Sequence, residues 1–135
     1  MKIKKIFLDT VFIVAFLIDK EDEHKRALEL SNSLKGKELV ITNAILIETI
    51  NLLEKKLNRN TQSILQAYEL IQDNFKIVYV DEELTKRAMK TLIKYKAKIG
   101  LADTLSIEVM KELNIYEIVS FDPDFDNKEN IIRIY

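Results

Sequence analysis

The sequence contains no cysteine and a single histidine, His24. Disulfide bonds and cysteine-based zinc sites are therefore excluded, and so is a zinc site built from several histidines. Any metal ion that the chain binds must be held mainly by oxygen ligands, which favours Mg²⁺ or Mn²⁺.

Glycine and proline are also scarce, with 2 and 1 copies in 135 residues. Such a composition favours long regular elements joined by short connections and disfavours a turn-rich β-sandwich. Hydrophobic residues make up 47% of the chain, which is enough to bury a core, and we expect one domain over residues 1–135. The net charge of −1 argues against a broad basic face, so that any binding of nucleic acid would have to use local patches.

The basic and apolar start of the chain looks like the beginning of a signal peptide. However, Asp9 interrupts the apolar run, and no small-residue cleavage site follows it. The apolar stretch that continues to Ile18 is too short to span a bilayer. We therefore expect a cytoplasmic protein that does not bind membranes.

Short apolar runs alternate with longer helical patterns along the chain. The predicted strands cover residues 3–8, 38–41, 76–80, 117–120 and 131–134, and the predicted helices cover residues 11–18, 21–34, 43–57, 61–74, 82–97 and 102–113. Strands separated by helices pair in parallel through right-handed crossovers. We therefore predict an α/β fold with a parallel sheet of about five strands and helices on both faces. Functional sites of such sheets lie at the carboxyl ends of the strands.

Four acidic residues stand near those strand ends. Asp9 and Asp122 directly follow predicted strands, whereas Glu48 and Asp103 lie in helices. Three of them also have a structural explanation, since Asp9 can cap a helix, Asp103 can stabilise a helix N-terminus and Asp122 can belong to a plain turn. Glu48 shares a helical face with Ile45, and an unpaired charge among apolar side chains is costly. We therefore expect Glu48 to be either paired or functional.

The weight of these acids lies in their combination. Four carboxylates within several ångströms of one another would repel strongly. They would have to take up protons, distort the fold or bind a cation. A hard divalent ion fits such a group and can orient and activate a water molecule for hydrolysis of a phosphodiester. The spacing alone does not show that the four converge.

Five segments resemble, in order, the motifs of the PIN-domain family of ribonucleases. They are residues 6–10 (IFLDT), 23–27 (EHKRA), 41–48 (ITNAILIE), 101–107 (LADTLSI) and 119–125 (VSFDPDF). This resemblance implies a five-stranded parallel sheet, one or two Mg²⁺ or Mn²⁺ ions and cleavage of RNA.

The resemblance also implies roles for particular residues. The acidic quartet would be Asp9, Glu48, Asp103 and Asp122, with Asp124 as an auxiliary metal ligand. Thr10 and Ser120 would orient carboxylates or water through their hydroxyl groups. The small size of the chain is most like the toxins of VapBC-type toxin–antitoxin pairs, which implies a small antitoxin as a partner and the formation of homodimers.

A basic segment precedes the third acidic motif. Lys94, Tyr95, Lys96 and Lys98 are candidates for contact with RNA, with the tyrosine ring stacking on a base. The alternative is a solvated helix end at which the helix dipole favours lysine. His24, on a charged helix, is expected to be a surface residue rather than a catalytic base.

Three kinds of function remain open at this point. The first is a metal-dependent endoribonuclease, either a toxin or a housekeeping RNA-processing enzyme. The second is a non-catalytic PIN domain that acts as an interaction module for protein or RNA. The third is another Mg²⁺ enzyme or a phospho-accepting receiver on a similar sheet. Such an enzyme, for example a haloacid-dehalogenase phosphatase, usually has a second aspartate two residues after the first, where this chain has Val11. A receiver would need a lysine after a late strand, and residues 120–122 contain none.

Overall fold

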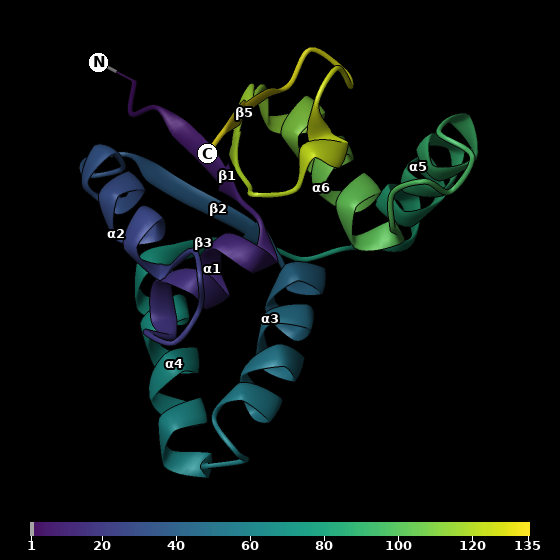
Figure 1. Cartoon of the computed structure of the whole chain (residues 1–135). Helices are drawn as coiled ribbons and strands as arrows, with labels where there is room; N and C mark the ends of the chain where they lie inside the picture. The colour runs from purple at the N-terminus through teal and green to yellow at the C-terminus, as the bar shows by residue number, and fades with distance from the viewer. Residues whose placement is uncertain (1) are drawn as a thin grey trace.

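The computed structural model describes residues 2–135 and shows a central sheet with helices around it (Figure 1). In chain order the elements are β1 (Lys5–Leu8), α1 (Thr10–Leu17), α2 (His24–Ser33), β2 (Glu38–Thr42), α3 (Asn43–Lys56), α4 (Thr61–Asn74), β3 (Phe75–Val78), α5 (Glu82–Lys94), α6 (Leu101–Leu113), β4 (Glu117–Val119), the 3₁₀ turn η1 (Pro123–Phe125) and β5 (Ile132–Ile134). This order confirms the α/β class expected from the sequence.

The five strands pair in the order β3-β2-β1-β4-β5, and every pairing is parallel. The chain runs outward from β1 through β2 to β3 and then returns to place β4 on the other side of β1. With right-handed crossovers, α1 to α4 cover one face of the sheet, and α5 and α6 cover the other. The strand order therefore reverses between β1 and β4, and ligands of such sheets bind at the carboxyl ends of the strands at this point.

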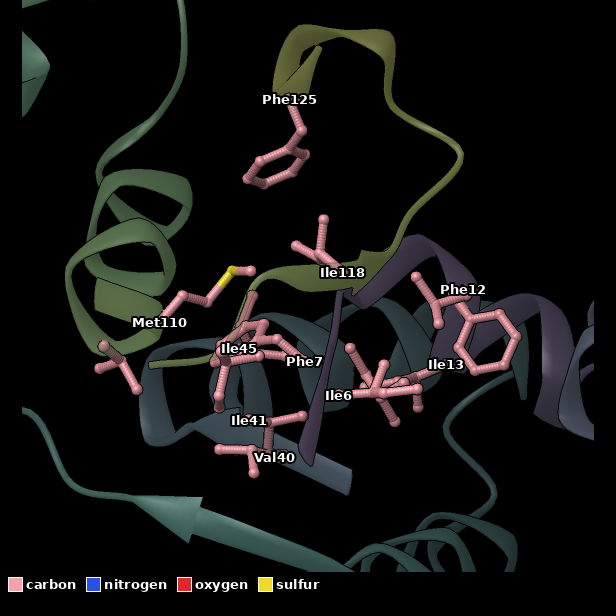
Figure 2. Close-up of a cluster of buried hydrophobic side chains, with 14 of the residues drawn as sticks. Ile6, Phe7, Phe12, Ile13, Val40, Ile41, Ile45, Met110, Ile118 and Phe125 are labelled. Carbon is pink, nitrogen blue, oxygen red and sulfur yellow. The ribbon is translucent and has the colours of Figure 1, made fainter. Parts of the chain in front are cut away.

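The core extends over both faces of the sheet. Phe7 pairs directly with Ile118, so that the two side chains point to the same face. Figure 2 shows Met110 of α6 on the side of Phe7, and Ile13 of α1 on the side of Ile6. All of these side chains are buried. Because both faces are covered, the central strands read as continuous apolar runs rather than alternating ones.

Side-chain caps determine where four of the helices begin. In each case a side-chain oxygen accepts a hydrogen bond from a backbone N–H of the first turn. The capping residues are Asp9 for α1, Thr42 for α3, Asn60 for α4 and Asp81 for α5.

The predicted boundaries differ from the observed ones mainly at helix ends. The helix expected over residues 21–34 begins at residue 24, and the helix expected over residues 82–97 ends at Lys94. Lys96 and Ala97 have φ values of 56° and 55°, which an α-helix cannot contain. None of the helices within residues 2–135 is long and apolar enough to cross a bilayer.

Candidate functional site

Asp9 lies directly after β1, at the carboxyl-end edge of the sheet, and is 5% exposed. Its Oδ1 accepts a hydrogen bond of 2.9 Å from the backbone N–H of Thr10, so the carboxylate does cap α1. Its Oδ2 accepts a hydrogen bond of 2.7 Å from the hydroxyl of Ser120, which follows β4. Because β1 and β4 are neighbours, these contacts hold the carboxylate at the point where the strand order reverses.

The surroundings of Asp9 disfavour its charge. Burial raises the pKa of Asp9 from 3.8 to about 6, against the opposing effect of the hydrogen bonds from Ser120 and Thr10. The negative charges of Glu48 and Asp122 are smaller contributions to the same rise. Strongly shifted carboxylates of this kind are typical of functional sites.

Asp103 lies in the first turn of α6 and is partly buried. Burial raises its pKa to about 7, and the charges of Asp9, Glu48 and Asp122 raise it in the same direction. A single hydrogen bond to the backbone at Gly100 opposes this shift. The four acids therefore act on one another electrostatically, although they are dispersed along the sequence.

Glu48 corrects one step of the sequence argument. The buried side chains of α3 are Ile45, Thr49 and Leu53, which follow one another at intervals of four residues. Glu48 lies beside this stripe and is exposed, as is Ile47. Burial among apolar side chains is therefore not the reason to assign it a function. That reason is the effect of its charge on the two aspartates.

Asp122 and Asp124 differ in position although they are close in sequence. Asp122 is half-buried, and its backbone N–H donates a hydrogen bond of 3.0 Å to the hydroxyl of Ser120. Its Oδ1 accepts a hydrogen bond of 2.9 Å from the backbone N–H of Asp124. The Asp124 side chain is exposed, and its charge is not among those that raise the pKa values of Asp9 and Asp103.

Two buried hydroxyl groups accompany the acids. The hydroxyl of Ser120 connects the Asp9 carboxylate to the backbone of Asp122. The hydroxyl of Thr10 has no hydrogen-bond partner among residues 2–135. A buried hydroxyl without a partner is costly, which makes it a candidate contact for a group that joins the site.

The PIN-domain family model matches residues 6–131 of the chain. The chain belongs to the PIN-domain family. The family expected from the ordered acidic motifs is thereby confirmed, and the third kind of function, another Mg²⁺ enzyme or a receiver on a similar sheet, is set aside.

Three solved structures share this PIN fold. VapC20 of Mycobacterium tuberculosis, described as a Sarcin-Ricin loop cleaving toxin, has a TM-score of 0.82 at 24% identity, over 92% of this chain and 95% of that one. DNA-bound VapBC from Salmonella typhimurium has a TM-score of 0.71 at 18% identity, over 98% of both chains. VapBC2 from Rickettsia felis, bound to promoter DNA, has a TM-score of 0.70 at 18% identity, over 96% of this chain and 97% of that one. No curated protein matches the sequence.

The donor set of this PIN domain suits a hard divalent cation. All four coupled groups are carboxylates, which Mg²⁺ and Mn²⁺ prefer, and a cation would lower the raised pKa values of Asp9 and Asp103. The unpartnered hydroxyl of Thr10 is a further polar group beside Asp9. Within residues 2–135, no three acidic or histidine side chains stand close enough to hold an ion in their present positions.

The basic segment before Asp103 is partly engaged within the protein. The Nζ of Lys94 lies 3.2 Å from a carboxylate oxygen of Glu129, which raises the pKa of Lys94, and 5.3 Å from the centre of the Tyr95 ring. Tyr95 is half-buried and packs against the core. Lys96 and Lys98 are exposed. A structural role therefore fits Lys94 and Tyr95 better than it fits the two exposed lysines.

Two side chains have contacts that the sequence did not indicate. The Nδ1 of His24 lies 2.7 Å from the carbonyl oxygen of Ala15, so this partly buried ring connects the start of α2 to α1. Arg133 on β5 donates to the carbonyl oxygen of Ser120. Its position in an alternating Ile-Arg-Ile strand was visible, but nothing in the sequence named its partners.

Proposed function

We propose that this PIN domain is an Mg²⁺- or Mn²⁺-dependent endoribonuclease that hydrolyses phosphodiester bonds in RNA, and that it is the toxin of a toxin–antitoxin pair. One observation carries the proposal. The charges of Glu48 and Asp122, which are far from Asp9 and Asp103 in sequence or on other elements, raise the pKa values of these two aspartates. No neighbouring Lys or Arg forms an ion pair with any of these four acids within residues 2–135.

Asp9, Glu48, Asp103 and Asp122 are the proposed ligands. When bound, a divalent ion supplies an activated water molecule and stabilises the charge that develops on the scissile phosphate. The chain's own contribution is orientation. The N–H of Thr10 and the hydroxyl of Ser120 fix both oxygens of Asp9, and each oxygen retains a lone pair for a ligand. Asp124 is the weakest member of the proposed metal site, because its carboxylate is exposed and lies outside the coupled group.

The fold relatives support the biological part of the proposal. One is a toxin that cleaves the Sarcin-Ricin loop, and others are toxin–antitoxin complexes. By analogy the substrate is single-stranded or structured RNA, and the partner is a small antitoxin. Formation of homodimers is part of the same analogy. Of the four residues in the basic segment, Lys96 and Lys98 are the stronger candidates to contact the RNA backbone, because both are exposed. Lys94 and Tyr95 are weaker candidates, because they are engaged within the protein.

The direct test is cleavage of labelled RNA oligonucleotides by the purified chain. Cleavage should require Mg²⁺ or Mn²⁺ and should stop with EDTA. Asp9→Asn and Asp103→Asn should each abolish it, whereas Asp73→Asn, which changes an exposed acid on α4, should not. The nuclease assignment fails if Asp9→Asn and Asp103→Asn retain full, metal-dependent activity.

One observation keeps a second candidate function open. The acids do not form a ready-made group of three at ligating distance within the described chain, as would suit a PIN domain that acts only as an interaction module. Titration with millimolar Mn²⁺ separates the two, because a module would show no saturable binding. A housekeeping nuclease would also bind the ion and cleave RNA, but it would have no antitoxin. A small protein that co-purifies with the chain and inhibits its cleavage of RNA would therefore identify the chain as a toxin.

A further inference from the structure

Arg133 contacts both ends of the segment that carries Asp122. It lies on the edge strand β5, opposite Ile118, and its side chain is 9% exposed. Its Nε and Nη2 donate to the two carboxylate oxygens of Asp126 at 2.8 and 3.1 Å. Its Nη1 donates to the carbonyl oxygen of Ser120 at 3.2 Å. One guanidinium group therefore joins the residue before the Asp122 turn to the residue after it.

The geometry of these contacts requires arginine. A two-bond pair with a carboxylate needs the planar fork of a guanidinium, and a lysine ammonium offers only a point charge. The guanidinium also lies 3.8 Å from the centre of the Tyr135 ring, which adds a cation–π contact. The hydrogen bonds to Arg133 lower the pKa of Asp126, so both partners stay charged at neutral pH.

The segment between those contacts ends on the proposed site. Ser120 is fully buried, and its hydroxyl contacts both the Asp9 carboxylate and the N–H of Asp122. Phe125 anchors the turn in the core, and Figure 2 shows its ring above Ile118. A shift of the Ser120 carbonyl would therefore move the hydroxyl that holds Asp9.

We propose that Arg133 is a positioning residue for the carboxylate site. By holding Ser120 and Asp126 it fixes the backbone from which Asp122 extends and, through the Ser120 hydroxyl, the orientation of Asp9. Its positive charge also lies near enough to Asp122 for the two to interact. The role of Arg133 in catalysis rests on the proposed function, whereas its role in holding the segment from Ser120 to Asp126 does not.

The test compares Arg133→Lys and Asp126→Asn with a matched control, Arg87→Gln. Arg87 forms an ion pair with Glu112 at 3.1 Å, which joins α5 to α6 away from the carboxylates. Asp126 is 43% exposed, so Asp126→Asn should fold even if a change at Arg133 does not. The first readout is hydrogen exchange of the Asp122 and Asp124 amides in the metal-free protein, measured by NMR. The second is the Kd for Mn²⁺.

Both test variants should speed exchange of these two amides by about tenfold or more, since a charged hydrogen bond is lost. They should also raise the Kd for Mn²⁺ by about tenfold, as expected when a group that orients ligands is removed. Arg87→Gln should change neither quantity. Unchanged amide exchange in both test variants would overturn the role of Arg133. If the native chain binds no Mn²⁺ and cleaves no RNA, the proposed function fails. The exchange data would still show whether Arg133 holds the segment from Ser120 to Asp126 in place.

Discussion

Carboxylates gather in two regions of this PIN domain, and the regions differ in their counter-charges. At the carboxyl end of β1, none of the four coupled acids belongs to an ion pair within residues 2–135. Around α5, α6 and the turn before β5, each acid of a second set contacts a lysine or an arginine. This paired set comprises Glu108, Glu112, Asp126 and Glu129.

The difference separates a structural use of acids from a chemical one. Glu108 accepts hydrogen bonds from Thr91 and Lys111, and the first of these joins α6 to α5. The contact with Arg133 lowers the pKa of Asp126, whereas burial and like charges raise the pKa values of Asp9 and Asp103. The paired acids stabilise the fold as anions. Asp9 and Asp103, by contrast, lie where a proton or a cation would be favoured over a bare negative charge.

The largest expected effect tests the exposed member of the unpaired set. Glu48→Gln should lower RNA cleavage by about a hundredfold, because the proposed metal site would lose a charged ligand. Glu54→Gln on the same helix is the control and should leave cleavage within about twofold of the native rate. Equal rates of RNA cleavage by Glu48→Gln and Glu54→Gln would show that Glu48 is not part of the catalytic site.

A pH series of the metal-free protein tests the two buried aspartates. The folded-state pKa values of about 6 for Asp9 and about 7 for Asp103 exceed the ordinary value of 3.8, so the folded protein binds more protons than the unfolded chain in this window. Their contribution to stability therefore falls as the pH rises from about 4 to 8. Relative to Asp9→Asn, the native chain should lose up to about 3 kcal/mol across that range.

Urea unfolding in EDTA at several pH values measures this difference. The comparison with Asp9→Asn cancels the titration of groups that Asp9 does not influence, including the paired acids, and retains the effect of Asp9 on Asp103. If the difference in free energy of unfolding between the native chain and Asp9→Asn does not change with pH, the environment of Asp9 does not disfavour its charge.

The paired set should respond in the opposite way. Glu108→Gln should destabilise the fold by about 1–2 kcal/mol at neutral pH, because the buried carboxylate loses its charge while Thr91 and Lys111 lose an anionic acceptor. Cleavage of RNA by the folded protein should not change. Urea unfolding at pH 7 measures the first effect, and a stabilised Glu108→Gln variant would break the distinction between the two sets.

The smallest effect is expected at the surface. Lys86 and Glu82 form an ion pair of 3.5 Å on α5, with side chains 69% and 85% exposed. Lys86→Gln should change the free energy of unfolding by less than about 0.5 kcal/mol, since solvent and salt screen such a pair. A loss of more than 1 kcal/mol in the same urea assay would mean that exposed pairs also matter in this fold.

The sequence predicted most of the fold, since its signals are local. Alternation of apolar runs with helical patterns predicted the five strands and the parallel sheet. Helix ends were less predictable. Nothing in the composition of Lys96-Ala97 announces a left-handed backbone, because only glycine and asparagine signal that conformation.

The candidate site was predicted as a set of residues but not as an arrangement. Convergence of Asp9 and Asp122 depends on β4 returning beside β1, which the order of elements permits but does not require. The exposure of Glu48 depends on which side of α3 meets α1, and the apolar neighbours on both sides concealed it. The contacts of Arg133 with Ser120 and Asp126 depend on the path of the last turn, for which no sequence rule exists.

The most direct test of the divalent-cation site is calorimetric titration of the metal-free chain with Mn²⁺ at pH 7.5. The unpaired carboxylates predict saturable binding that disappears in the double variant Asp9→Asn/Asp103→Asn, while Glu108→Gln retains it. Binding should also stabilise the native chain against urea, by an amount that rises with the logarithm of the Mn²⁺ concentration above its Kd. Absence of saturable binding to the folded native chain, or equal binding by the double variant, would contradict the assignment of these four acids as a metal site.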